Sequence, residues 1–86
     1  MAEERIGEVM KYFSKPSVAA VKITGGSLSV GDQVRFMGHT TDFEDTIASM
    51  EVNNEQIETA KVGDYIGVRV AGRVRPGDEV IKILPE

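Results

Sequence analysis

Val30-Gly31-Asp32-Gln33-Val34 is the first of three related stretches, and the others are Val62-Gly63-Asp64-Tyr65-Ile66 and Pro76-Gly77-Asp78-Glu79-Val80. Each places Gly-Asp after an apolar or proline residue and before an apolar residue that opens a β-rich run. Glycine adopts positive φ without a clash at Cβ, and an aspartate carboxylate accepts hydrogen bonds from nearby backbone N–H groups. The three stretches therefore predict three corners at which a connection becomes a strand, in a small all-β domain.

Outward from these corners, the apolar pattern predicts about six strands, at residues 5–13, 18–24, 33–37, 43–52, 65–71 and 78–84. Six strands with short links favour a small closed antiparallel β-barrel of six to seven strands, because closure removes exposed sheet edges. We expect residues 1–4 to be a flexible N-terminus and residues 5–86 to form a single barrel domain. The expected interior residues are Val9, Val21, Ile23, Leu28, Val34, Phe36, Ile47, Ile57, Ile66, Val68 and Val80.

A few positions interrupt the strand pattern. Ile47 and Met50 are three residues apart, which predicts a bulge or a switch of face between them. Gly67 lies in mid-strand, where glycine usually marks a bend or a close approach of backbone. Val30 is expected to point inward from a short extended connection, and residues 56–61 are compatible with one helical turn.

Composition excludes several classes of protein. The 86 residues are enough for one domain with a small core. Without cysteine there is neither a disulfide nor a thiolate metal site, and with one histidine a zinc site would need carboxylates for nearly every ligand. The acidic start has no apolar run of signal-peptide or membrane-spanning length. We therefore expect a cytoplasmic protein with no metal, no cofactor and no membrane association.

Catalytic signatures are also lacking. Ser49, His39 and Asp42 offer the residue types of a hydrolase triad, but no nucleophile elbow is present. Gly25-Gly26 lacks the Lys-Ser/Thr that follows the glycines of a phosphate-binding loop. Because so small a core can hardly enclose a pocket, we expect no catalytic residues, and neither binding nor hydrolysis of GTP.

The net charge of −4 is unevenly spread along the chain. Residues 1–41 carry +1, residues 42–64 carry −6, and residues 65–86 carry +1. The acidic middle would repel a phosphate backbone, so any face that binds nucleic acid must lie elsewhere.

The most chemically diverse stretch is Gly38-His39-Thr40-Thr41-Asp42-Phe43. It combines a titratable ring, two hydroxyl groups, a carboxylate and an aromatic ring. As a loop on a rigid scaffold it is a candidate for recognising a partner. Alternatively, its polar side chains bond only the local backbone and Phe43 fills the core.

Arg69, Arg73 and Arg75 form the second candidate site. Their guanidinium groups suit phosphate or carboxylate partners, or else they pair with the surplus acids of residues 42–64. We expect the docking face to combine these arginines with the loop of residues 38–43.

Aromatic residues beside bases are the third candidate. Tyr12 and Phe13 lie near Lys11 and Lys15, an arrangement that can stack nucleobases. Because side chains alternate along a strand, at most one of the two rings is available to a partner.

In their order, these stretches resemble the second domain of the translational GTPases, the β-barrel that follows the G domain in elongation factor Tu and related initiation factors. The similarity covers residues 5–84 and is also seen in small stand-alone elongation factor-like proteins and in a barrel at the end of some collagenase-like peptidases. The matching motifs are Ile6-Gly7-Glu8-Val9, Val18-Ala19-Ala20-Val21-Lys22-Ile23, Gly26-Ser27-Leu28-Ser29-Val30-Gly31-Asp32-Gln33-Val34, Ala60-Lys61-Val62-Gly63-Asp64-Tyr65-Ile66-Gly67-Val68 and Arg75-Pro76-Gly77-Asp78-Glu79-Val80.

This resemblance implies a non-enzymatic binding module that contacts a protein or ribonucleoprotein partner in translation. It does not imply GTP binding, because no G domain is present. Direct binding of RNA or tRNA is one alternative, and a role as accessory domain for a separately encoded collagenase-like peptidase is another. The oligomeric state stays open.

Overall fold

Every regular element of the structure, a computed structural model that describes residues 2–84, is a β-strand. Met1 of the expected N-terminal segment and residues 85–86 of the expected domain lie outside the described residues. No helix long and apolar enough to span a membrane occurs among residues 2–84. The strands are β1 (Ala2–Phe13), β2 (Val18–Ile23), β3 (Ser27–Ser29), β4 (Gln33–Met37), β5 (Asp42–Thr46), β6 (Met50–Val52), β7 (Glu55–Ile57), β8 (Thr59–Lys61), β9 (Tyr65–Arg69) and β10 (Glu79–Leu84).

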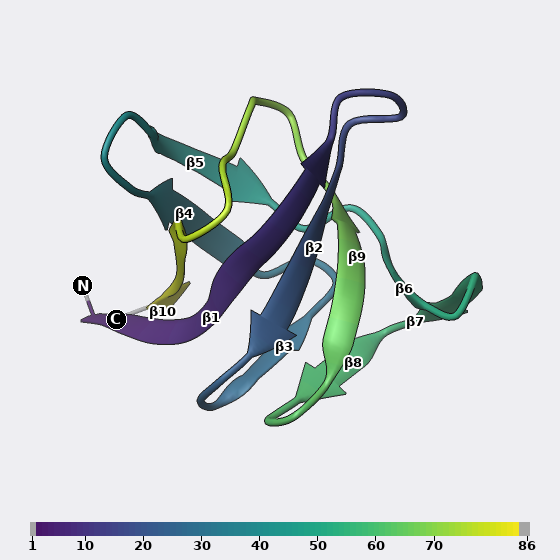
Figure 1. Cartoon of the computed structure of the whole chain (residues 1–86). Helices are drawn as coiled ribbons and strands as arrows, with labels where there is room; N and C mark the ends of the chain where they lie inside the picture. The colour runs from purple at the N-terminus through teal and green to yellow at the C-terminus, as the bar shows by residue number, and fades with distance from the viewer. Residues whose placement is uncertain (1, 85–86) are drawn as a thin grey trace.

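The strands form an eight-stranded sheet and a two-stranded sheet (Figure 1). The order in the large sheet is β5-β4-β10-β1-β2-β9-β6-β7, and all neighbours are antiparallel, while β3 pairs with β8. The all-β prediction is therefore confirmed, but the closed barrel of six to seven strands is wrong. Within the described residues, β5 and β7 end the large sheet without pairing with each other.

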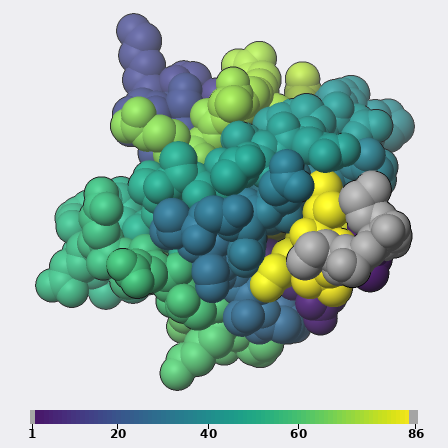
Figure 2. Space-filling view, turned by 180° about the vertical axis from the view of Figure 1, so that it is seen from behind, coloured from purple at the N-terminus to yellow at the C-terminus, as the bar shows by residue number. Residues whose placement is uncertain are grey.

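β1 organises the large sheet because it pairs with two partners in succession. Its first part pairs with β10 and its second part with β2. A bulge at Ile6 interrupts the pairing with β10 and another at Met10 interrupts the pairing with β2, which explains why the alternation of β1 in the sequence is imperfect. The strand begins at Ala2, opposite Leu84 and earlier than predicted, so the start of β1 and the end of β10 lie together (Figure 2).

The three Gly-Asp corners form as predicted, and all are the same type of turn. Their glycines have φ values of 97° at Gly31, 96° at Gly63 and 94° at Gly77. In each corner the aspartate N–H donates to the carbonyl oxygen three residues earlier, which with a positive φ at the third position makes a type II turn. The carboxylate in return accepts the N–H of that earlier residue, at 2.8 Å from Ser29, 3.0 Å from Lys61 and 2.8 Å from Arg75.

Each corner also holds one buried aliphatic residue of another segment, which we call its clasped residue. The glycine N–H donates to the carbonyl oxygen of this residue, whose own N–H donates to the aspartate carbonyl oxygen, with N···O distances of 2.8–2.9 Å. The clasped residues are Ile47 for the first corner, Ile23 for the second and Val9 for the third. A corner is therefore both a turn and a tie between distant parts of the chain.

The core matches most of the predicted interior. Every residue of that set is buried except Ile57, which is only half-buried at its margin. Val30 was predicted to point inward and is instead 43% exposed, because the second residue of a type II turn points away from the strands. The core also contains six residues outside that set, namely Ile6, Ala19, Met50, Ala60, Val70 and Val74.

The predicted strand at residues 43–52 is two strands, β5 and β6. The break at residues 47–49 falls where the first corner clasps Ile47, and Ile47 and Met50 are both buried. Residues 56–61 belong to β7 and β8 and form no helical turn. Asn53 and Asn54 have φ values of 52° and 66°, so they close the β6–β7 hairpin as a two-residue turn with both central φ positive.

The corner conformation makes a prediction for Gly63→Ala. A Cβ at Gly63 meets no atom within 4 Å, so the cost comes only from holding alanine at φ 96°. We expect the free energy of unfolding to fall by about 1–3 kcal/mol. The matched control is Gly67→Ala in mid-strand, where a Cβ would make ordinary contacts and the change should stay below about 1 kcal/mol. Urea denaturation measures both, and equal losses would contradict the assigned role of the corner.

A second prediction concerns the core. Val68 is 1% exposed, so Val68→Ala should lower the free energy of unfolding by about 1–4 kcal/mol through lost burial and a residual cavity. Val62→Ala removes the same atoms from a side chain that is 59% exposed and should stay within about 0.5 kcal/mol. Thermal unfolding of both variants tests this, and a Val62 effect as large as that of Val68 would refute the burial pattern.

Candidate partner-binding surfaces

The loop of residues 38–43 is the β4–β5 hairpin turn together with the start of β5. The Gly38 N–H donates to the Thr41 carbonyl oxygen at 2.8 Å and closes the turn. His39, Thr40 and Asp42 are exposed, whereas Thr41 is only 5% exposed. Three side chains of this loop are therefore open to a partner, and Thr41 is not.

Phe43 belongs to the margin of the core. It is half-buried and lies opposite Phe36, with the two ring centroids 5.3 Å apart. Gly72 covers the ring so closely that a Cβ there would lie 3.1 Å from Cζ of Phe43. The structural role considered for Phe43 is the one that its surroundings favour.

The segment of residues 70–78, which carries Arg73 and Arg75, packs against this hairpin (Figure 1). A Cβ on Gly38 would overlap the Asp78 carboxylate, so the third corner lies directly on the hairpin turn. The Ala71 N–H donates to Asp45 Oδ2 at 2.8 Å. The hairpin and the two arginines, predicted to form one face, thus lie on adjoining segments.

Arg69 belongs to a different surface. It lies on β9 opposite Val18 and lines a small hollow of about 120 Å³ that Gln56 and Ser49 also line. Within residues 2–84, none of Arg69, Arg73 and Arg75 forms an ion pair.

The acids near the hairpin pair with Arg35 instead of these arginines. Arg35 contacts Glu44 at 3.2 Å, Glu3 at 3.6 Å and Asp42 at 3.7 Å. The alternative in which Arg69, Arg73 and Arg75 neutralise the acids of residues 42–64 is therefore not realised in the described part of the chain.

Tyr12 and Phe13 divide as strand alternation requires. Tyr12 packs against the core, whereas Phe13 is 48% exposed. Only Phe13 is available to a partner, together with the exposed Lys11 and Lys15.

The residue types of a hydrolase triad do not form a recognisable catalytic set. Ser49 lines hollows beside Gln56, whereas His39 and Asp42 belong to the β4–β5 hairpin. Within residues 2–84, no group of three or more histidine, aspartate and glutamate side chains could hold a metal ion.

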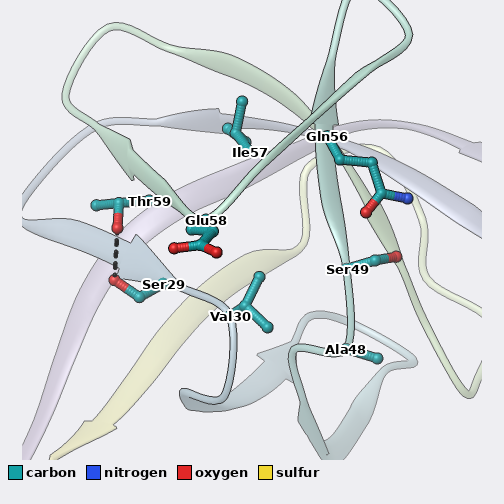
Figure 3. A pocket seen from close by; sticks show the side chains of 8 residues that line it. All are labelled: Ser29, Val30, Ala48, Ser49, Gln56, Ile57, Glu58 and Thr59. Carbon is teal, nitrogen blue, oxygen red and sulfur yellow. Dashed lines mark hydrogen bonds between the residues drawn. The ribbon is translucent and has the colours of Figure 1, made fainter.

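The larger of two hollows that the sequence pattern missed has a volume of about 570 Å³ (Figure 3). Glu58 is the one carboxylate that residues 2–84 contribute to its lining, and Ser29 Oγ lies 3.3 Å from Thr59 Oγ1 at one side. The lining comes from residues 29–30, 48–49 and 56–59, which the β3–β8 pairing and the first corner bring together. Such a hollow suits a polar or cationic group, but no contiguous motif announces it.

The second missed hollow, of about 440 Å³, lies over β2, β9 and β6. Phe13 and Tyr65, which are 48% and 59% exposed, are the aromatic residues in its lining. They are far apart in the sequence and meet only through the strand register.

Comparison with known proteins finds sequence similarity between this chain and parts of proteases. No family model matches it. It is 37% identical over 76 residues to an uncharacterised protease of Methanocaldococcus jannaschii and 31% identical over 78 residues to a collagenase of Porphyromonas gingivalis. These alignments cover 87% and 90% of this chain but 18% and 22% of the relatives. The chain therefore spans about a fifth of the length of these curated relatives.

Solved structures with a similar fold also belong to a protein assigned to the peptidases. The C-terminal domain of a Geobacillus thermoleovorans protein assigned to the U32 peptidases superposes with a TM-score of 0.86 at 20% identity, covering 94% of this chain and 93% of that domain. The fold is that of a U32 peptidase C-terminal domain. A selenomethionine variant of the same domain gives a TM-score of 0.83.

These findings correct the assignment to the second domain of the translational GTPases. The sequence matches of 31% identity and above are to proteases and the structural matches to a U32 peptidase C-terminal domain, so the interpretation as a translation-factor binding module is wrong. The motifs that suggested it are largely the Gly-Asp corners and the strands that follow them. Such motifs describe backbone geometry, which unrelated functions can share.

The hairpin makes a prediction that separates its structural residues from its accessible ones. Phe43→Ala should lower the free energy of unfolding by about 1–3 kcal/mol, because the ring packs on Phe36 and under Gly72. His39→Ala should change it by less than about 0.5 kcal/mol, because His39 is exposed. Chemical denaturation compares the two, and a stable Phe43→Ala variant would return this ring to the set of free recognition residues.

Proposed function

We propose that the chain is a non-catalytic accessory domain that works with a U32-type, collagenase-like peptidase unit. This proposal depends on one observation: nearly the whole chain aligns with each of two proteases, but with only about a fifth of the length of each. A domain of nearly the same extent forms the C-terminal part of the Geobacillus protein. The peptidase chemistry then belongs to the remainder of such proteins, and this domain supplies binding.

Features of the surface support a binding role. Phe13 and Tyr65 expose aromatic rings, and exposed rings that share one hollow are typical of contact surfaces. Arg69 lines the adjoining hollow, and arginine is enriched at protein interfaces. We infer that the partner is polypeptide, either the peptidase unit itself or the protein on which it acts.

Reconstitution tests the proposal. The chain is mixed with the purified catalytic unit of a U32-type peptidase from the same organism, and association is followed by analytical ultracentrifugation. We expect a complex with a Kd of about 10 μM or tighter, in the range of transient protein–protein interfaces. Cleavage of gelatin should accelerate, while cleavage of a short fluorogenic peptide should not, because only a large substrate reaches a second binding surface.

The matched control is the second domain of elongation factor Tu, a β-domain of similar size that should neither bind nor accelerate cleavage. Absence of a complex at micromolar concentration, together with unchanged gelatin cleavage, would refute the accessory role.

A further inference from the structure

The outer face of β1, β2, β9 and β6 carries a continuous groove. The hollow of about 440 Å³ and the smaller one of about 120 Å³ share four lining residues, namely Pro16, Val18, Glu51 and Gly67. We call the combined depression the outer groove.

Strand register places the residues of this face in three rows across the strands. The central row is Lys11, Ala20, Gly67 and Glu51. On one side lies the row of Phe13, Val18 and Arg69, and on the other the row of Glu8, Lys22 and Tyr65. Because residues directly opposite in an antiparallel sheet share a face, small side chains form the middle of the groove, and each flanking row contains one aromatic ring.

The floor is open because Gly67 and Ala20 leave it uncovered. A Cβ at Gly67 would lie 3.4 Å from Val18 Cγ1 and 3.5 Å from Glu51 Cγ, both ordinary contacts. The fold therefore does not require glycine here, and an extended chain can approach the backbone of β9. The rings of Phe13 and Tyr65 flank this floor with about half of their surface exposed.

Four cations surround the groove on a chain whose net charge is −4. Lys15 and Arg69 line it, Lys11 ends the central row, and Lys22 Nζ lies 5.4 Å from the centroid of the Tyr65 ring. None of the four forms an ion pair within residues 2–84. Among the described residues, Glu51 is the one carboxylate in the lining of the groove, and Glu8 stands in the same row as Lys22. The groove is thus a cationic, aromatic site on an acidic protein.

We propose that the outer groove binds an extended polypeptide segment with apolar and acidic side chains, supplied by the substrate of the peptidase. This rests on the proposed accessory function and names the kind of chain that the domain would hold. Apolar side chains of the segment lie against Phe13 and Tyr65, and its carboxylates meet Lys15 and Arg69.

Glu51 favours a peptide over a nucleic acid. A nucleic acid carries a phosphate at every nucleotide and would be repelled by this carboxylate in the central row. A peptide can instead place a backbone N–H against Glu51 and its own carboxylates against Lys15 and Arg69. Electrostatic complementarity with the surrounding cations then orients an acidic segment across the strands.

Fluorescence anisotropy with the full chain tests this proposal without any peptidase. The probe is a short fluorescein-labelled peptide rich in phenylalanine, proline and glutamate. Its counterpart carries lysine in place of each glutamate, and a labelled oligothymidylate represents nucleic acid. We expect the acidic peptide to bind at least about tenfold more tightly than the lysine peptide, and binding to weaken with salt.

Two pairs of variants locate the site. Lys15→Ala/Arg69→Ala and Arg73→Ala/Arg75→Ala remove the same charge, but only the first pair should weaken binding, by about tenfold. Phe13→Ala/Tyr65→Ala should weaken it similarly, whereas Val62→Ala, which trims an exposed apolar side chain outside the groove, should not. Gly67→Leu should abolish binding while circular dichroism and thermal unfolding stay close to those of the parent chain.

Several outcomes would overturn the proposal. Equal loss with Arg73→Ala/Arg75→Ala would place the site on the hairpin face, and tighter binding of oligothymidylate would make the groove a nucleic-acid surface. No binding of the acidic peptide by a chain that still associates with the peptidase unit would remove this inference and leave the accessory role standing. Peptide binding without peptidase association would do the reverse.

Discussion

The bond from a corner aspartate to the backbone three residues earlier is the interaction on which the rest of this fold depends. It fixes a type II turn at Asp32, Asp64 and Asp78, and each turn then presents one N–H and one carbonyl oxygen to a clasped residue. Because β5 and β7 are not paired, the large sheet lacks a closing ladder among the described residues. The corners supply backbone ties that a ladder would otherwise provide.

A second constraint on the fold is that neighbouring segments approach the backbone of certain glycines too closely for a side chain to fit. A Cβ at Gly7 would lie 2.8 Å from the Lys22 carbonyl oxygen, so the bend of β1 onto β2 needs a residue without a side chain. Gly38 serves the third corner in the same way, by leaving room for the Asp78 carboxylate. Gly67 differs from both, because the space above it is open to the outer groove.

Local chemistry is what the sequence predicts well here. The corners follow from glycine at positive φ and an aspartate acceptor, both of which can be recognised within five residues, and alternation identifies ten of the sixteen buried hydrophobic residues in the described part of the chain. Pairing between distant strands cannot be recognised from local sequence, so the prediction of a closed barrel was wrong. Val30 was predicted to point inward but is exposed, because it is the second residue of a type II turn. The candidate sites show the same limit on what the sequence predicts. The hairpin loop is one short stretch of sequence and the arginines lie in another, so each could be recognised, whereas Phe13, Gly67 and Tyr65 meet only through strand register. The family resemblance failed for a related reason, because its motifs were mostly corners.

The clasps also bear on how the chain reaches this structure. A corner is a local turn that can form early, but its clasped residue is distant in the sequence. The loop that the clasp closes is shortest between Gly31 and Ile47, longer between Ile23 and Gly63, and longest between Val9 and Gly77. Loop closure becomes costlier with length, and domains dominated by such distant contacts fold slowly for their size. Loop length therefore predicts an order of closure, in which the first corner assembles with the middle of the chain and the third joins the two ends last. We expect folding of this domain to be a succession of three ring closures, each initiated at a turn that forms before its clasped residue arrives.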